Sequence, residues 1–208
     1  MPQTQEPQGS SATPLQQKQI AVFLDRDGTL NEEKGYLRQV DDLVLLPGAA
    51  NAIRRLNDAG ILTVLTTNQT GPARGFYGED HVLALNKRLV SLLEKEGGAH
   101  LDAIYYCPHL AKGSVPEYAL ECDCRKPQTG MIDKACTAFP GINRELSYVL
   151  GDKASDVEFG HNAGCKTFLL KTGYGTRVLE GKYQVLSTKP TYVADSVVEA
   201  VDLILQSV

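Results

Sequence analysis

Short apolar runs alternate with segments of helical periodicity along the chain. The apolar runs have the length of buried strands, and the segments between them place apolar residues three or four positions apart. We expect strands over residues 20–25, 61–68, 103–107, 146–152, 166–172 and 191–194. We expect helices over residues 48–60, 79–98, 130–139, 154–164 and 195–206. Such alternation predicts a single doubly wound α/β domain, with a parallel sheet covered by helices on both faces.

Two of the expected helices show a clear apolar face. The helix over 48–60 has apolar residues at Ala49, Ala52, Ile53 and Leu56. The helix over 79–98 has apolar residues at Val82, Leu85, Leu89, Leu92 and Leu93. Each segment ends in glycine, a common helix stop signal. We expect both apolar faces to pack against the sheet.

Composition excludes some classes of partner. The 208 residues suffice for one domain with a substantial core. The net charge of −4 argues against nucleic acid, whose phosphates favour a basic surface. No apolar run approaches the roughly 20 residues of a membrane helix, and the chain opens without a secretory signal. We therefore expect a cytoplasmic protein with no membrane partner, and nothing in the sequence requires more than a monomer.

The first part of the chain differs in composition from the rest. Residues 1–19 are rich in Gln, Pro, Ser and Thr and contain no apolar periodicity. Such a segment cannot bury enough apolar surface to fold. We expect residues 1–19 to form a disordered tail and residues 20–208 to form the folded domain.

Candidate chemistry gathers where the expected strands end, beginning with the first strand. The strand over 20–25 runs into Asp25, Arg26 and Asp27. If the strand continued, the two carboxylates would lie on the same side of the sheet. Two like charges at that distance raise each other's pKa unless a cation lies between them. The pair therefore indicates a bound cation or a shared proton.

Polar residues also follow the second and fourth expected strands. The second strand ends in Thr66, Thr67, Asn68 and Gln69. The fourth strand ends in Gly151, Asp152 and Lys153, and Asp156 follows one helical turn later. Between these two strands in the sequence lie Arg125, Lys126 and Pro127. The carboxyl ends of parallel strands meet at one edge of a sheet, and ligands bind there. Three carboxylates with a hydroxyl group and a lysine would fit Mg²⁺ beside a phosphate group.

Each of these motifs also has a simpler explanation. An Asp-x-Asp pair is common in surface loops, and residues 151–156 could form an ordinary helix cap. Thr67 could be a strand-forming residue, and Lys126 could be an exposed loop charge. Their arrival together at the strand ends of one sheet favours a shared site.

Three of the five cysteines lie close together in the second half of the chain. Cys107 and His109, followed by Cys122 and Cys124, offer three thiolates and one imidazole, which complete a tetrahedral Zn²⁺ set. Because no coordination position stays open, the zinc would be structural and would hold the polar loop 107–124 in place. The alternative is a group of reduced cysteines that bind no metal.

The strand-end motifs resemble those of the haloacid dehalogenase superfamily of phosphotransferases. The motifs are FLDRDGTL, LTTNQTG, CRKP and GDKASD. The resemblance implies a Rossmann-like fold in which Asp25 is the nucleophile and forms an aspartyl-phosphate. It implies that Asp27 protonates the leaving group and later activates water. Thr67 and Lys126 would bind the oxygens of the transferring phosphoryl group.

The same resemblance implies a set of magnesium ligands. The Asp25 carboxylate, the main-chain carbonyl of Asp27 and the Asp152 carboxylate would hold Mg²⁺. Asp156 would contact the ion only indirectly. An aspartate two residues after the nucleophile is typical of the hydrolases of the superfamily rather than of its dehalogenases.

With the cysteine loop included, the resemblance narrows to the D-glycero-D-manno-heptose 1,7-bisphosphate 7-phosphatase family. It covers roughly residues 20–175, through DRDGTLNEEKGY, TNQTGPARG, YYCPH, CDCRKPQTGM and GDKASD. It implies removal of the C7 phosphate, which leaves heptose 1-phosphate for nucleotide-activated heptose and surface-glycan biosynthesis. The substrate contacts that it implies are Glu33, Lys34, Gly35, Tyr36, Thr67, Asn68, Gln69, Thr70, Arg125, Lys126 and Lys153. The chain departs from the pattern at Leu110, which is not a zinc ligand.

The spacing of the motifs leaves no room for a cap domain. A turn and a helix separate Asp25 from Thr67, and a helix, a strand and the cysteine loop separate Thr67 from Lys126. We therefore expect an open site whose rims are the loops 31–36 and 71–80. Within the second rim, Arg74 is a candidate contact for a second phosphate, and Arg125 is a further recognition candidate because its forked donors suit phosphate.

Three other functions stay open. Histidinol-phosphate phosphatases share the catalytic and zinc motifs, but their substrate carries one phosphate and would depend less on Arg74 or Lys153. A non-catalytic phosphosugar-binding protein would not require both Asp25 and Asp27. A phosphomutase would normally exclude water, which an open site does not favour.

Overall fold

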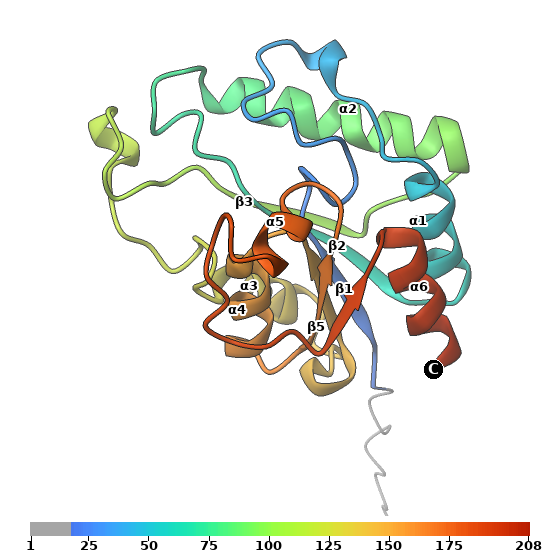
Figure 1. Ribbon diagram of the computed structural model, residues 1–208. Coiled ribbons are helices and arrows are strands. Elements are labelled where there is room, and N and C mark those ends of the chain that lie inside the picture. Colours follow the sequence, from blue (N-terminus) through green and yellow to red (C-terminus); the bar gives the residue numbers. More distant parts are fainter. Residues whose placement is uncertain (1–17) are drawn as a thin grey trace, which may run out of the picture.

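One parallel sheet forms the centre of the molecule (Figure 1). The structure is a computed structural model and describes residues 18–208. The expected N-terminal tail therefore lies outside the described residues, apart from Lys18 and Gln19. Six strands pair in the order β3-β2-β1-β4-β5-β6, all of them parallel. The doubly wound sheet expected from the alternating pattern is confirmed.

The helices and strands lie close to their expected positions. The strands are β1 Ala21–Leu24, β2 Leu62–Asn68, β3 Ala103–Cys107, β4 Tyr148–Gly151, β5 Lys166–Leu170 and β6 Tyr192–Ala194. The helices are α1 Ala49–Asp58, α2 Glu79–Gly97, α3 Gly130–Ala138, α4 Ala154–Asn162, α5 Gly175–Leu179 and α6 Val197–Gln206. No sequence pattern predicts α5, because five residues are too short to show helical periodicity.

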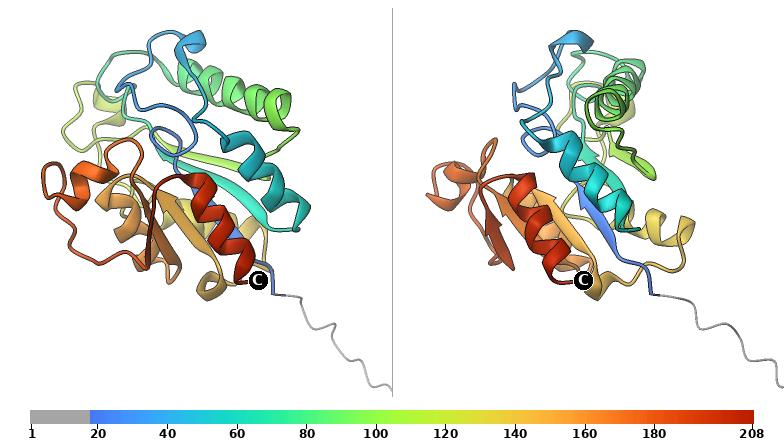
Figure 2. Two further views of the ribbon diagram at one scale, coloured as in Figure 1. Left: turned by 45° about the vertical axis from the view of Figure 1, so that its right-hand side comes forward. Right: turned by 90° about the vertical axis from the view of Figure 1, so that its right-hand side faces the viewer.

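The side chains of the central strands divide between two hydrophobic layers. On β1, Val22 and Leu24 belong to the layer that α1, α2 and α6 cover, whereas Ala21 and Phe23 belong to the layer that α3 and α4 cover. This division follows from the two-residue period of a strand. All four residues are fully buried. The predicted apolar faces of α1 and α2 are buried as well, and Figure 2 shows helices on both sides of the sheet.

The strand order places the candidate site. The order reverses between β1 and β4, which are neighbours in the sheet although α1 to α3 separate them in the chain. In open parallel sheets, ligands bind at this reversal, outside the carboxyl ends of the strands. Residues 25–48 add only the short 3-10 helix Val40–Asp42, and residues 108–129 add only the 3-10 helix Pro116–Tyr118. Neither segment forms a cap domain over that end of the sheet.

Among residues 18–208, none of the helices has the length and apolar character needed to cross a membrane.

Candidate active site

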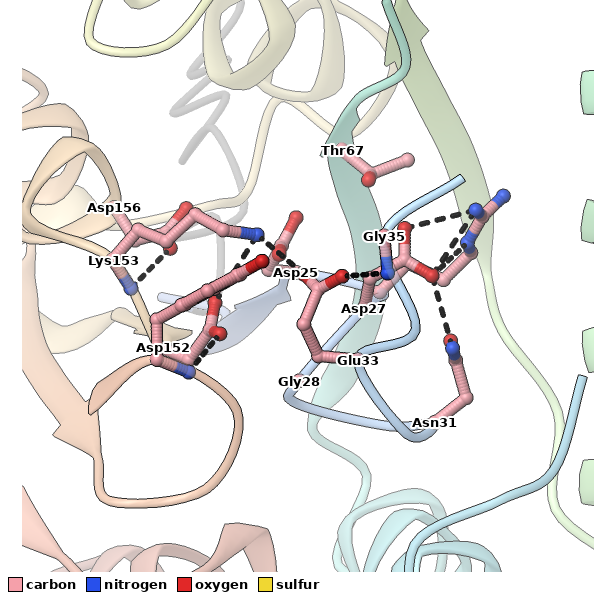
Figure 3. A network of polar contacts seen from close by, with 12 residues as sticks. Asp25, Asp27, Gly28, Asn31, Glu33, Gly35, Thr67, Asp152, Lys153 and Asp156 are labelled. Atoms are coloured by element: carbon pink, nitrogen blue, oxygen red, sulfur yellow. Dashed lines mark hydrogen bonds and ion pairs between the residues drawn. The ribbon is translucent and has the colours of Figure 1, made fainter. Parts of the chain in front are cut away.

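The chain turns sharply after β1, which separates the two aspartates of the Asp-x-Asp motif. The N–H of Asp25 still donates to the carbonyl of Leu150 on β4, at 2.9 Å. Three residues later, Gly28 has φ +84°, in the left-handed region that glycine adopts without strain. As Figure 3 shows, the carboxylates of Asp25 and Asp27 therefore have different neighbours. They do not form the close pair that a continuing strand would produce.

Asp25 belongs to a cluster of three buried carboxylates. Asp25 follows β1, Asp152 follows β4 and Asp156 lies in the first turn of α4; each offers an oxygen within 4.8 Å of the others. The ammonium group of Lys126 donates to Asp25 Oδ1 at 2.8 Å and also to Asp156. Asp156 in addition accepts the backbone N–H of Lys153 at 3.0 Å, so it stabilises the start of α4. Asp156, whose exact role could not be read from the sequence, therefore contacts Lys126 and the start of α4.

The three carboxylates differ in electrostatic environment. Burial alone would raise the pKa of Asp25, but the ammonium groups of Lys126 and Lys153 outweigh it and hold this pKa below the ordinary value. Burial raises the pKa of Asp152 to about 8, and the charges of Asp25 and Asp156 add to the effect. Asp25 is therefore an anion at neutral pH, as a nucleophile must be.

Asp152 also has an unsatisfied oxygen. Its Oδ2 accepts the backbone N–H of Tyr174 at 2.8 Å, but its Oδ1 is buried and has no hydrogen-bond partner among residues 18–208. The nearest cation, Lys153 Nζ, is 3.6 Å from this atom. A buried carboxylate oxygen without a donor is costly, and oxygen ligands of this kind suit Mg²⁺. The residues present therefore fit a magnesium ion between Asp25 and Asp152.

A second network orients Asp27. The guanidinium group of Arg26, which is 2% exposed, donates to Asp27 Oδ2 at 2.8 Å and to Gln69 Oε1 at 2.9 Å. Gln69 donates to Asp27 Oδ2 and to Thr67 Oγ1, at 2.9 Å in both cases. Asn31 donates to Asp27 Oδ1 at 2.9 Å. No sequence motif indicates a role for Arg26, because its partners Gln69 and Asn86 lie far away in the chain. The hydrogen bond of Asn31 to Asp27 likewise depends on the turn between them.

Asn68 fixes the segment that carries Lys126. Its side-chain amide donates to the Lys126 carbonyl at 3.2 Å, and its side-chain oxygen accepts the Lys126 N–H at 3.1 Å. The two hydrogen bonds join the end of β2 to the segment that follows the cysteine loop. Asn68, expected as a substrate contact, thus also holds the lysine in place.

The predicted zinc ligands come together. Their ligand atoms are Cys107 Sγ, His109 Nδ1, Cys122 Sγ and Cys124 Sγ, with separations of 3.0–3.7 Å between the contacting pairs. Zinc bond lengths of about 2.0–2.3 Å place ligands roughly 3.3–3.8 Å apart in a tetrahedron. None of the cysteines is in a disulfide. The four residues therefore fit a structural zinc ion, and the Arg125 guanidinium group donates to the His109 carbonyl at 3.0 Å.

A cleft of about 330 Å³ opens beside these groups. Ten of the residues expected to form the site line it: Asp27, Glu33, Gly35, Tyr36, Asn68, Gln69, Thr70, Arg74, Arg125 and Lys153. Lys153 donates to Glu33 at 3.0 Å, and Tyr36 Oη lies 3.2 Å from Thr70 Oγ1. Asp25, Thr67, Lys126 and Asp152 are buried next to the cleft. Lys34 does not join them, because its ammonium group faces the Asp42 carbonyl and the Glu32 carboxylate.

Five further residues line the cleft: Tyr77, Ser155, Tyr174, Tyr183 and Gln184. Tyr77 lies in the expected rim 71–80, whereas the other four lie outside the residues expected at the site. Ser155 and Tyr174 follow β4 and β5, so the rule that ligands bind at the carboxyl ends of strands could have identified them. Tyr183 and Gln184 lie beyond α5, and no local pattern in the sequence indicates their position.

Comparisons with known proteins agree with this geometry. Residues 123–200 match the family model described as HAD-hydrolase-like. The D-glycero-D-manno-heptose-1,7-bisphosphate 7-phosphatase of Thermosynechococcus vestitus is 49% identical over 187 residues, which cover 88% of this chain and 94% of that protein. The D-glycero-beta-D-manno-heptose-1,7-bisphosphate 7-phosphatase of Escherichia coli is 40% identical over 156 residues, which cover 74% of this chain and 80% of that protein.

A solved structure is similar over nearly the whole chain. The crystal structure of D,D-heptose 1,7-bisphosphate phosphatase from B. bronchiseptica, complexed with magnesium and phosphate, aligns with a TM-score of 0.78 at 29% identity. The alignment covers 91% of this chain and 99% of that one.

Proposed function

This chain belongs to the D-glycero-D-manno-heptose-1,7-bisphosphate 7-phosphatase family of haloacid dehalogenase-like hydrolases, and we propose that it removes the C7 phosphate of that heptose bisphosphate. The product would be heptose 1-phosphate, which keeps the C1 phosphate needed for nucleotide activation. One observation carries the proposal: a buried Asp25 that is held ionised by Lys126, at the base of a cleft lined with further cations. Residues 20–208 would form one catalytic domain, with the loop 107–124 as its zinc-binding insertion.

In the first step, a carboxylate oxygen of Asp25 attacks the phosphorus atom of the C7 phosphate. The bond between phosphorus and the C7 oxygen breaks, and the C7 oxygen takes a proton from Asp27. The product of this step is an aspartyl-phosphate on Asp25. The Lys126 ammonium group and the Thr67 hydroxyl group would donate hydrogen bonds to the phosphoryl oxygens and so stabilise the negative charge that develops there.

In the second step, water attacks the same phosphorus atom. Asp27 takes the proton from the water, and the bond between phosphorus and the Asp25 oxygen breaks. Inorganic phosphate leaves, and both aspartates return to their starting states. The hydrogen bonds from Arg26, Asn31 and Gln69 support this role, because they fix the Asp27 carboxylate at the edge of the cleft.

Asp25, the main-chain carbonyl of Asp27 and Asp152 would hold the magnesium ion. When bound, Mg²⁺ supplies positive charge that allows two anions, the carboxylate and the phosphate, to approach one another. The unsatisfied Asp152 Oδ1 supports this assignment. Lys126 forms an ion pair with Asp156, so Asp156 adds no uncompensated negative charge beside the ion.

The remaining cations suit a substrate with a second phosphate. Arg74, Arg125 and Lys153 all line the cleft. Arg125 is anchored by its hydrogen bond to the zinc loop, so loss of zinc would also loosen the contact that it offers to substrate. A histidinol-phosphate phosphatase would have less use for three cations around one cleft.

Phosphate release with Mg²⁺ present tests the proposal. Both anomers of the heptose bisphosphate are compared with histidinol phosphate, and ³¹P NMR identifies which phosphate leaves. We expect kcat/KM to favour one bisphosphate anomer by roughly 100-fold or more, because polar subsites discriminate strongly. The Asp25→Asn variant should lose activity by a factor on the order of 10⁴ or more.

Asp58→Asn is a suitable control, since Asp58 is 59% exposed on α1 and forms a surface ion pair with Arg54. It should keep full activity. Preference for histidinol phosphate would reassign the substrate while keeping the chemistry. Full activity of Asp25→Asn would contradict the assignment of the nucleophile.

A further inference from the structure

One wall of the cleft has no part in the chemistry described above. Tyr174 and Tyr183 stack with ring centroids 4.2 Å apart and ring planes 6° from parallel. Both line the cleft, as does Gln184. They belong to the segment after β5, which carries no motif that pointed to phosphoryl transfer. We call these three residues the aromatic wall.

The base of the aromatic wall is fixed to the catalytic cluster. The backbone N–H of Tyr174 donates to Asp152 Oδ2 at 2.8 Å. Two residues earlier, Thr172 Oγ1 donates to the carbonyl of Gly28 at 2.6 Å. The Lys153 ammonium group lies 5.3 Å from the centroid of the Tyr174 ring. Tyr174 is therefore held in a defined position relative to the reacting groups.

The end of α5 brings Tyr183 back to Tyr174. Gly181 has φ +67° and donates its N–H to Val178, and the N–H of Lys182 donates to the Arg177 carbonyl at 2.7 Å. These two hydrogen bonds form a Schellman motif, in which a glycine in the left-handed conformation ends the helix and reverses the chain. The reversal places the Tyr183 ring against Tyr174.

The aromatic wall offers a partly exposed ring and one acceptor that has no hydrogen-bond partner within residues 18–208. Tyr183 is 43% exposed although its ring is stacked. The side-chain oxygen of Gln184 is buried without a hydrogen-bond partner. Buried acceptors are nearly always paired, so we expect this oxygen to accept a hydrogen bond from a bound ligand. An exposed ring beside an unpaired acceptor is a surface suited to a ligand that is partly apolar and carries hydroxyl groups.

The residues around the cleft differ in chemistry. Arg74 and Arg125 line it as cations suited to phosphate, whereas Tyr183 and Gln184 contribute ring surface and an amide group. Arg177 lies 5.7 Å from the centroid of the Tyr183 ring and does not line the cleft. The carbon chain of a sugar presents C–H groups and hydroxyl donors, which match that surface. A phosphate group matches the cations instead.

We propose that Tyr183, supported by Tyr174, and Gln184 bind the sugar part of a phosphosugar substrate, so that the cleft favours a phosphosugar over free phosphate without a cap. The proposal rests on the proposed function for the identity of the sugar. It assigns no proton transfer to these residues. Their contribution is to affinity for the part of the substrate that carries no phosphate.

Calorimetric binding to the Asp25→Asn protein with Mg²⁺ present tests this wall. Three ligands are compared: heptose 1,7-bisphosphate, fructose 1,6-bisphosphate and inorganic phosphate. Adding Tyr183→Ala should raise the Kd of both sugar bisphosphates by roughly tenfold, the effect of losing one aromatic contact. The Kd of inorganic phosphate should not change. Tyr183→Phe keeps the ring and should restore most of the affinity.

Tyr192→Ala is the matched control, because Tyr192 is 41% exposed and stacks on Phe168 at 4.7 Å, on the edge strand β6. It should bind all three ligands as the parent does. Thermal unfolding checks that each variant is folded, and the KM of the otherwise wild-type Tyr183→Ala enzyme provides a second measurement.

Unchanged Kd values for the sugar bisphosphates would overturn the proposal. An equal loss of affinity for inorganic phosphate would overturn it too, because the segment would then only support Asp152. Tighter binding of the hexose bisphosphate than of the heptose bisphosphate by the parent protein would contradict the proposed function. The effect of Tyr183→Ala on either sugar would still decide whether the wall binds sugar.

Discussion

Lys126 links two of the three buried carboxylates of the site. Its ammonium group is 3% exposed and pairs with two carboxylates, Asp25 and Asp156. Both aspartates are buried, so neither has water to replace the lysine. Burial alone would lower the pKa of Lys126, but the two carboxylates outweigh it and raise this pKa. The lysine is therefore charged throughout the physiological pH range.

We expect Lys126→Met to lower both activity and stability. Loss of one transition-state donor should reduce kcat by roughly 10²–10³-fold. The free energy of unfolding should fall by about 3–5 kcal/mol, since removal of one partner leaves buried charges uncompensated. Steady-state kinetics and urea denaturation measure the two effects.

A second substitution separates these effects. Lys126→Met combined with Asp156→Asn removes one of the stranded carboxylates, so part of the stability should return while activity stays low. Lys171→Met is the matched control, because Lys171 pairs with Asp195 at 2.6 Å but is 47% exposed. An exposed pair contributes at most about 1 kcal/mol. Equal destabilisation by Lys126→Met and Lys171→Met would contradict this account.

At the scale of elements, the cysteine loop connects β3 to the basic pair of the site. Cys107 ends β3, and Cys124 immediately precedes Arg125 and Lys126. The segment from Cys107 to Gly130 contains one turn of 3-10 helix and little apolar surface of its own. Four converging ligands can order such a segment, because metal binding contributes directly to folding.

Cys122→Ser should therefore affect the site from a distance. We expect the zinc content, measured by mass spectrometry, to fall well below one ion per chain, together with a lower Tm. Activity should fall by at least about tenfold, since small displacements of positioning groups can cost on the order of 100-fold. Cys136→Ser is the control, because Cys136 is also half-buried but lies on α3 outside the cluster. Unchanged zinc content in Cys122→Ser would rule out the proposed ligand set.

Sequence patterns identified the elements that carry long-range periodicity and missed those defined by contacts. The predicted apolar faces of α1 and α2 are buried. The buried face of an amphipathic helix can be predicted from the spacing of its own apolar residues. The helix α5 shows no such spacing, because it is five residues long and Val178 is its one buried apolar side chain. Its position depends on Leu169 and Val157, which other elements supply.

The same distinction applies to the candidate site. The residues that end β1, β2 and β4 were found because chemistry at strand ends has a sequence pattern. The orientation of Asn68 toward the Lys126 backbone and the stacking of Tyr183 on Tyr174 were not found. Each joins segments that are far apart in the chain or separated by a turn, so the partner cannot be read from local sequence.

At the scale of the whole molecule, three segments meet at the reversal of strand order. The turn after β1, the end of β4 and the turn after β5 surround the Asp152 carboxylate. Gly28 and Gly173 both have positive φ and both lie against Asp152. A side chain on either glycine would overlap this carboxylate. The absence of side chains there lets the two halves of the sheet bring their loops together around one charged group.

This arrangement predicts that Gly28→Ala and Gly60→Ala will have different consequences, although both glycines have positive φ. Gly60, at φ +70°, has no atoms within 4 Å of an added Cβ, so its substitution should cost only the roughly 1–2 kcal/mol of a left-handed alanine. Gly28, at φ +84°, should incur that cost and also displace Asp152. We expect Gly28→Ala to lose activity by about 100-fold and to need more Mg²⁺ for half-maximal rate, whereas Gly60→Ala stays fully active. Urea denaturation and magnesium titration of the rate distinguish the two, and equal activity in both variants would mean that the convergence at Asp152 does not govern the site.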